Sequence, residues 1–140
     1  MKKKQSPLNK MLSVLILLII IVAIALSCGK KDTSDIMRDN LSKALSQGVM
    51  SMSIDEFNLS ENDDGTYSIL TTVKYAGDYH STETIEQLSL TPVVRQFFED
   101  NKEVSNLRII AYGIVDNHVH DFVYERNGAS AVLKESTKLQ

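Results

Sequence analysis

Two histidines at a two-residue spacing are the residues of this sequence best suited to metal chemistry. His118 and His120 would point to the same side of an extended strand. Neutral imidazoles with a carboxylate suit zinc. Asp116 and Asp121 are nearby, and His80 or Asp78 could join from a loop. Two histidines without a fixed third ligand equally describe a polar pair after a hairpin turn. His118, His120 and His80 are therefore candidate metal ligands.

Other patterns of catalytic residues are missing from the sequence. No serine lies in a G-x-S-x-G motif, and no glycine-rich phosphate loop is present. Three pairs of adjacent carboxylates fall at a predicted bulge, a turn and a helix end, which favours solvated surface: Asp55/Glu56, Asp63/Asp64 and Glu99/Asp100. We predict no catalytic residue and no cofactor other than a covalent lipid, so an enzyme is not the expected function.

Aromatic side chains provide a second candidate surface. Tyrosine is frequent in binding surfaces because its ring is apolar and its hydroxyl is polar. About half of these rings would lie on the open face of a sheet that helices cover on one side only. Ordinary strand propensity is the alternative explanation. The candidate binding residues are Tyr67, Tyr75, Tyr79, Tyr112, Phe122 and Tyr124.

The single cysteine, Cys28, follows a long apolar segment almost directly. Four lysines and no acidic residue precede 13 residues without a polar side chain, Val14 to Leu26. This run is short for a permanent membrane-spanning helix, which needs about 17–25 residues, and it fits the apolar region of a secretory signal, about 7–15 residues. One cysteine excludes a disulfide framework, so an exported thiol needs another explanation.

Residues 1–28 resemble the signal peptide of a bacterial lipoprotein. Ser27 and Cys28 match the small residue and the cysteine at the cleavage position of the lipobox, whereas Ala25 and Leu26 stand in an unusual order. The resemblance implies that the Cys28 thiol receives a diacylglyceryl group and that the acylated cysteine becomes the N-terminus. Because each buried methylene contributes about 0.8 kcal/mol, two acyl chains would hold the protein stably at a membrane.

Two alternatives stay open for this segment. An uncleaved segment 1–27 would act as a transmembrane anchor with its lysines in the cytoplasm. Cleavage after an A-x-A-like motif, at Ala23-Ile24-Ala25 or Ala25-Leu26-Ser27, would release a secreted protein. In all three cases the rest of the chain lies outside the cytoplasm.

The charges are distributed unevenly along the 140 residues. Residues 1–28 carry +4, and residues 29–140, with 11 basic and 18 acidic residues, carry −7. Nucleic-acid backbones need clustered lysine and arginine, so nucleic acid is not an expected partner. Residues 28–33, which comprise the acylated cysteine and a short polar stretch, would form a flexible tether.

The spacing of apolar residues predicts the helices and strands that follow residue 33. Apolar spacing predicts a helix over about 35–47 and a hairpin over about 50–75, with a bulge near Asp55-Glu56. Residues 82–101 have helical spacing that Pro92 interrupts, which predicts two helices meeting at 90–92 or one kinked helix. Residues 105–115, apolar on both faces, predict a central strand covered on both sides, followed by a strand over 118–126.

The element order α-ββ-α-ββ predicts an α+β fold: a small antiparallel sheet with helices packed on one face. This domain would span residues 34–126, with residues 127–140 as a loose C-terminal tail. A chain of this length is expected to form one domain.

The expected function is that of a binding or interaction module held at the cell membrane or outer membrane by a lipid on Cys28. Its domain would face away from the cytoplasm and bind an envelope protein or a small ligand. The alternative is a small metal-binding protein or metal-dependent enzyme that uses His118 and His120.

Overall fold

The computed structural model describes residues 16, 19, 32–77 and 81–140. The chain divides into two units, Met1–Asp32 and Thr33–Gln140. The second unit contains, in chain order, α2 (Thr33–Ser46), β1 (Met52–Glu61), β2 (Tyr67–Tyr75), α3 (Thr82–Ile85), the π-helical turn η1 (Glu86–Leu90), α4 (Thr91–Asp100), β3 (Val104–Gly113), β4 (Val119–Asn127) and β5 (Ser130–Lys138). Among the described residues, no helix is long and apolar enough to cross a membrane. Apart from residues 16 and 19, the predicted N-terminal segment 1–27 lies outside the described residues.

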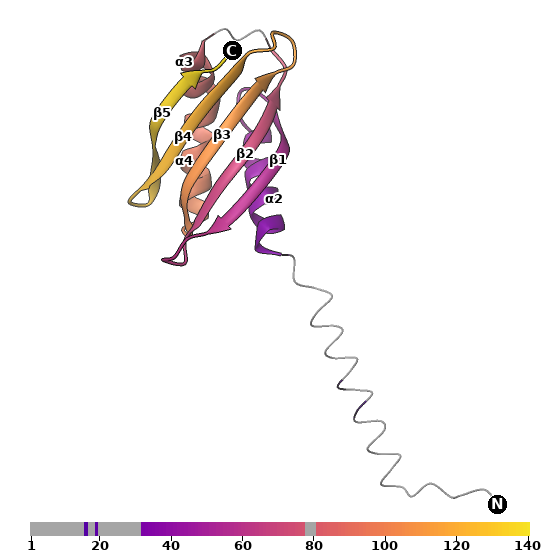
Figure 1. Cartoon of the computed structure of the whole chain (residues 1–140), viewed down its shortest axis with the longest axis vertical. Coiled ribbons are helices and arrows are strands. Elements are labelled where there is room, and N and C mark those ends of the chain that lie inside the picture. The colour runs from indigo at the N-terminus through magenta and orange to yellow at the C-terminus, as the bar shows by residue number, and fades with distance from the viewer. Residues whose placement is uncertain (1–15, 17–18, 20–31, 78–80) are drawn as a thin grey trace, which may run out of the picture. The chain divides into compact units, whose positions relative to one another are not determined.

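Five strands form one sheet in the order β1-β2-β3-β4-β5 (Figure 1). The pairs β1/β2, β3/β4 and β4/β5 are antiparallel, whereas β2 and β3 run parallel. A parallel pair needs a crossover connection, and the helical segment 82–100 provides it. The α+β prediction therefore stands, but the predicted all-antiparallel sheet is wrong and the sheet is mixed.

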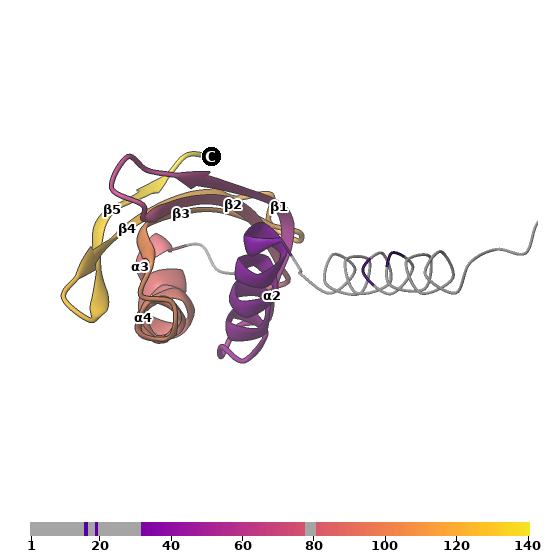
Figure 2. The ribbon, with the colours of Figure 1, turned by 90° about the horizontal axis from the view of Figure 1, so that it is seen from below.

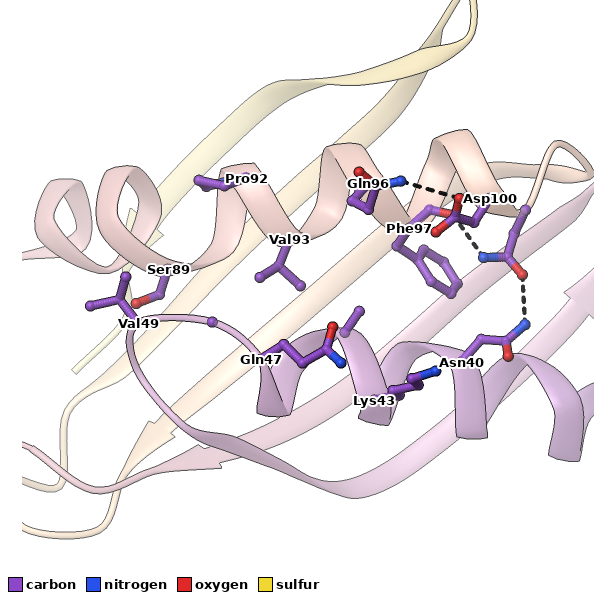
Figure 3. A pocket seen from close by; sticks show the side chains of 13 residues that line it. Asn40, Lys43, Gln47, Val49, Ser89, Pro92, Val93, Gln96, Phe97 and Asp100 are labelled. Carbon is purple, nitrogen blue, oxygen red and sulfur yellow. Dashed lines mark hydrogen bonds between the residues drawn. The ribbon is translucent and has the colours of Figure 1, made fainter.

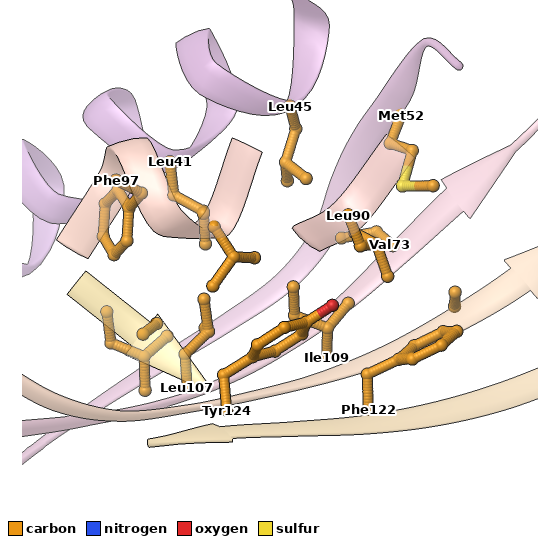
Figure 4. Packing of buried hydrophobic residues seen from close by; sticks show 14 of the residues in the cluster. Leu41, Leu45, Met52, Val73, Leu90, Phe97, Leu107, Ile109, Phe122 and Tyr124 are labelled. Carbon is orange, nitrogen blue, oxygen red and sulfur yellow. The ribbon is translucent and has the colours of Figure 1, made fainter. Parts of the chain in front are cut away.

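The helices α2 and α4 lie on the same face of the sheet, as the view along the strands shows (Figure 2). We call the opposite side the open face. Apolar residues of both helices and of the inner sheet face form one core, which Figure 4 shows around Leu41, Phe97 and Tyr124. Its largest fully buried side chains also include Tyr75, Phe98 and Phe122. Helices on one face of the sheet agree with the sequence-based prediction.

The C-terminal residues form a strand and not the predicted loose tail. β5 pairs with β4 from Asn127↔Ser130 to His120↔Lys138, with a bulge between Val123 and Tyr124. Ala131 is buried and Leu133 packs against the core, whereas residues 134–138 are exposed. Because so few of its residues are buried, β5 lacks the clear apolar alternation that would have marked it as a strand.

The helical segment 82–100 is continuous and does not split at Pro92. Leu90 and Thr91 both have right-handed helical backbone angles, so Thr91 is not the predicted N-cap. The Thr91 backbone N–H donates to the carbonyl of Glu86, five residues earlier, which is the wide turn of a π-helix. Proline collides with the carbonyl four residues earlier in a regular helix, and the wider turn before Pro92 relieves this.

The first hairpin agrees closely with the sequence-based prediction. The register of β1 and β2 shifts between Ile54 and Glu56, which is the predicted bulge. The turn between them is closed by a hydrogen bond from the Asn62 N–H to the Thr66 carbonyl, 2.8 Å. Gly65 has φ 78, a backbone angle that glycine adopts without strain. The first helix, predicted at 35–47, also lies within two residues of α2.

The prediction that the strand over 105–115 is covered on both faces is wrong. β3 is central in the sheet, but within residues 32–77 and 81–140 the helices cover one of its faces only. Tyr112 is 41% exposed on the open face, and Ile114 and Val115, at 62% and 67%, lie in the turn after β3. The apolar residues on its second face therefore do not belong to the core.

Candidate functional site

The structure places His118 and His120 close together, but their rings are not oriented toward one metal position. His118 precedes β4, and its Nδ1 lies 3.2 Å from the Asp116 Oδ2. His120 is fully buried, and the two rings stand 6.2 Å apart and nearly perpendicular. No group of three histidine, cysteine, aspartate or glutamate residues that could hold a metal occurs in the described parts of the chain. The third candidate, His80, lies outside them.

The surroundings of His120 make its ring a poor ligand for an external group. Neither ring nitrogen of His120 has a hydrogen-bond partner among the described residues. Its pKa is lowered because burial disfavours the charged ring, and the charges of Lys138 and His118 add to this. The ring therefore stays neutral at pH 7, stacked near Phe122 at a centroid distance of 6.3 Å.

Tyr75 and Asp116 fill the same end of the sheet. The side chain of Asp116 is 5% exposed, and its Oδ1 accepts a hydrogen bond from the His118 backbone N–H, 2.9 Å. Burial, followed by the charge of Asp116, raises the pKa of Tyr75 to about 12, so its hydroxyl stays protonated. A Cβ at Gly113 would collide with Asp116 and lie 2.9 Å from the Tyr75 hydroxyl. A side chain at position 113 would therefore not fit, although Gly113 also lines an open pocket of about 690 Å³ together with Lys74 and Asn117.

The aromatic candidates are mostly core residues. Tyr75, Phe122 and Tyr124 are fully buried on the face that the helices cover, and the Tyr124 hydroxyl lies 3.1 Å from the Thr91 hydroxyl. Tyr67 is half-buried and packs against the core. Tyr112 alone of the described candidates lies exposed on the open face, and Tyr79 is outside the described residues. The predicted aromatic platform on the open face is therefore not formed by these residues.

A groove between α2 and α4 has a volume typical of a small-ligand site (Figure 3). Its volume is about 540 Å³, within the range of about 300–1,000 Å³ that is typical of such sites. The groove exists because α2 turns Met37, Leu41 and Leu45 toward the sheet, while α4 does the same with Val94, Phe97 and Phe98. The sides of the two helices that face each other are left partly unfilled.

Both ends of this groove are closed by contacts between the two helical segments. At one end, the Asn40 amide donates to the Asn101 Oδ1, 2.9 Å, and the Asn101 amide donates to the Phe97 carbonyl, 2.7 Å. At the other end, Gly48 lies so close to Val93 that a Cβ would stand 3.2 Å from its Cγ2. From Asn40 to the end of α2 at Ser46 is about 9 Å along the helix.

The walls of the groove combine an apolar floor with polar groups at the rim. Ala44, Val93 and Phe97 provide apolar surface, and Gln47 and Gln96 bring one amide from each wall. Ser89, in the π-helical turn near Gly48, is 3% exposed, and its hydroxyl has no hydrogen-bond partner among the described residues. π-Helical turns are frequent at functional sites, and a buried hydroxyl without a partner is unfavourable unless something else supplies one.

Charged residues stand on opposite walls of the groove. Lys43 on α2 and Asp100 on α4 both line it, and they form no ion pair with each other or with any other described residue. The Asp100 carboxylate accepts one hydrogen bond, from the Gln96 amide at 3.1 Å. The sequence-based reading treated Glu99/Asp100 as solvated surface and did not identify this groove.

The open face of the sheet is shallower and carries its own ion pairs. Arg108 on β3 makes a two-pronged contact with Asp121 on β4, with Nη2 2.6 Å from Oδ2. Lys74 on β2 pairs with Asp55 at the β1 bulge, 2.8 Å. Because these charges are already matched within the chain, the open face offers less unsatisfied polar chemistry than the groove.

Comparison with known proteins adds no family to this picture: no family model, no curated protein and no solved structure matches the chain. Cys28, the predicted lipidation site, lies outside the described residues.

The sequence contained one weak indication of the groove. Asn40, Lys43, Ala44 and Gln47 recur at helical spacing beside the apolar stripe of the first helix.

Proposed function

We propose that this chain is a lipid-anchored protein whose domain faces away from the cytoplasm and binds a ligand or an envelope protein. The observation that carries the proposal is the position of Cys28, the one cysteine in the chain. It stands after a basic, apolar leader and only five residues before α2 begins at Thr33. Acylation at this position would use a thiol that an exported protein otherwise leaves unpaired.

The domain supports a binding role in two ways. First, the five residues from Cys28 to Asp32 span at most about 17 Å when extended, so the domain would stay close to the membrane surface. Second, the groove between α2 and α4 combines apolar walls with polar side chains at its rim, which is the usual composition of a binding site.

The proposal is tested by the intact mass of the protein extracted from membranes of cells that express the full chain. We expect a mass that begins at Cys28 and includes two or three acyl chains. A Cys28→Ala variant should lose the acyl mass and, if the leader is no longer cleaved, keep all 140 residues.

Three outcomes would contradict this proposal. A full-length mass with an unmodified thiol would show an uncleaved anchor, and a mass that begins after Ala25 or Ser27 without acyl chains would show a secreted protein. Recovery of the wild-type protein from the cytosol would contradict all three readings of the leader.

A further inference from the structure

The groove between α2 and α4 holds two opposite charges that the chain itself leaves unmatched. Lys43 and Asp100 are both exposed, stand on different helices and line the same cavity. Opposite charges that face one cavity without pairing can each bind one end of a zwitterion. In Figure 3 the two side chains lie on opposite sides of the gap between the helices.

The groove next to these charges is apolar and short. Ala44 follows Lys43 on α2, and Val93 and Phe97 lie across from it on α4. From Lys43 to the end of α2 at Ser46 is about 4.5 Å along the helix, and the lining of the groove continues to Gly48, which leaves room for a medium-sized side chain. Ser89, whose buried hydroxyl has no hydrogen-bond partner among the described residues, also lines the groove.

We infer that this groove binds a free α-amino acid with an apolar side chain. Its carboxylate would contact the Lys43 ammonium, its ammonium would contact the Asp100 carboxylate, and its side chain would pack against Ala44 and Val93. In an α-amino acid the ammonium and the carboxylate are both attached to Cα. They could therefore contact two protein charges that line the same groove.

The inference deepens the proposed function, since it names the class of ligand for the binding module. Leucine is the probe, and equilibrium dialysis of radiolabelled leucine against the membrane-extracted full chain measures binding, with empty detergent micelles as the blank. Leucinamide lacks the carboxylate and N-acetyl-leucine lacks the ammonium. We expect each to compete about tenfold or more weakly than leucine, because each loses one charge-assisted hydrogen bond.

Two variants test which charge of the ligand each helix contacts. Lys43→Gln should weaken leucine binding about tenfold and leave competition by leucinamide unchanged, because leucinamide has no carboxylate to lose. Asp100→Asn should weaken leucine binding by a similar factor and leave N-acetyl-leucine unchanged. Arg38→Gln and Glu99→Gln are the matched controls, since both residues are exposed on the same two helices and do not line the groove. Both control variants should bind leucine as the unaltered protein does.

Failure of this inference can be told apart from failure of the proposed function. No leucine binding at about 10 mM by a folded protein would overturn the inference, as would equal competition by all three probes, which would indicate an apolar ligand without charge recognition. The intact mass of the same preparation reports lipidation separately. A protein without acyl chains that binds leucine would contradict the proposed lipid anchor and support the inference that the groove binds an amino acid.

Discussion

His120 is a polar side chain in an apolar, buried environment. It is fully buried beside Tyr75 and Phe122, and neither ring nitrogen has a partner among the described residues. Lys138 from β5 and His118 from the preceding turn disfavour its protonation, and Asp116 opposes them with a smaller effect. An imidazole in this position is tolerated because it stays neutral.

This burial predicts that the protein is less stable in mild acid. The pKa of His120 is lowered from 6.5 in the folded state, so the unfolded chain binds a proton that the folded chain does not. Stability is therefore fully present above about pH 6.5 and falls as the pH drops below it. Urea unfolding at about pH 7.5 and 5.5 measures the difference, and His120→Phe should reduce it because phenylalanine has no proton to gain.

The matched variant for this experiment is His118→Gln. His118 is only partly buried and lies against Asp116, so its replacement removes a histidine without removing the buried one. We expect His118→Gln to keep the loss of stability in acid. Equal acid dependence in His120→Phe and the unaltered protein would show that other groups cause it.

At the scale of elements, Arg126 joins three parts of the domain at one end. Its guanidinium donates to the carbonyls of Phe98 at 2.9 Å, Asn101 at 2.7 Å and Val104 at 2.7 Å. The end of α4, the start of β3 and the strand β4 are therefore held by one side chain. Its guanidinium carbon also lies 5.1 Å from the Phe98 ring centroid, within the range of a cation–π contact.

We expect Arg126→Met to lower the free energy of unfolding by about 2–4 kcal/mol, because it leaves helix-end carbonyls without donors while keeping the apolar stem. Arg126→Lys should recover only part of this loss, since a single ammonium cannot reach three separated carbonyls. Urea unfolding of the variants checks this. Arg95→Met on the exposed side of α4 is the control, and an equally small effect for both would show that the contacts add little.

The elements show where local sequence was sufficient and where it was not. The β1–β2 turn was predictable because Asp64 accepts hydrogen bonds from the Thr66 backbone and hydroxyl, 2.9 and 2.6 Å, within two residues. This same contact lowers the pKa of Asp64. In contrast, β5 was missed because its pairing partner is β4 and its own residues are largely polar.

For the whole molecule, the buried core lies entirely in the second unit of the chain. Every buried core residue among those described falls between Met37 and Ala131. The described residues before Met37 thus contribute nothing to this core.

We therefore expect a protein that begins at Gly29 to fold as the full chain does. Its thermal unfolding midpoint should agree within about 2 °C with that of the full chain in detergent, because a difference of 1 kcal/mol would shift it by several degrees. Circular dichroism during heating checks this. A much lower midpoint, or a loss of the cooperative transition, would show that residues 1–28 stabilise the domain.

The sequence by itself determined features that depend on neighbouring residues: the turn at Gly65, the bulge near Asp55 and the helix that became α2. The lipidated leader at Cys28 stays a prediction from the sequence. Tertiary structure decided which face each strand turns inward, so that Tyr75 and Tyr124 became core and Tyr112 did not. It also decided the parallel pairing of β2 with β3 and the groove that brings Lys43 near Asp100. These depend on contacts between residues far apart in the chain, and a one-residue change of face reverses every side chain of a strand.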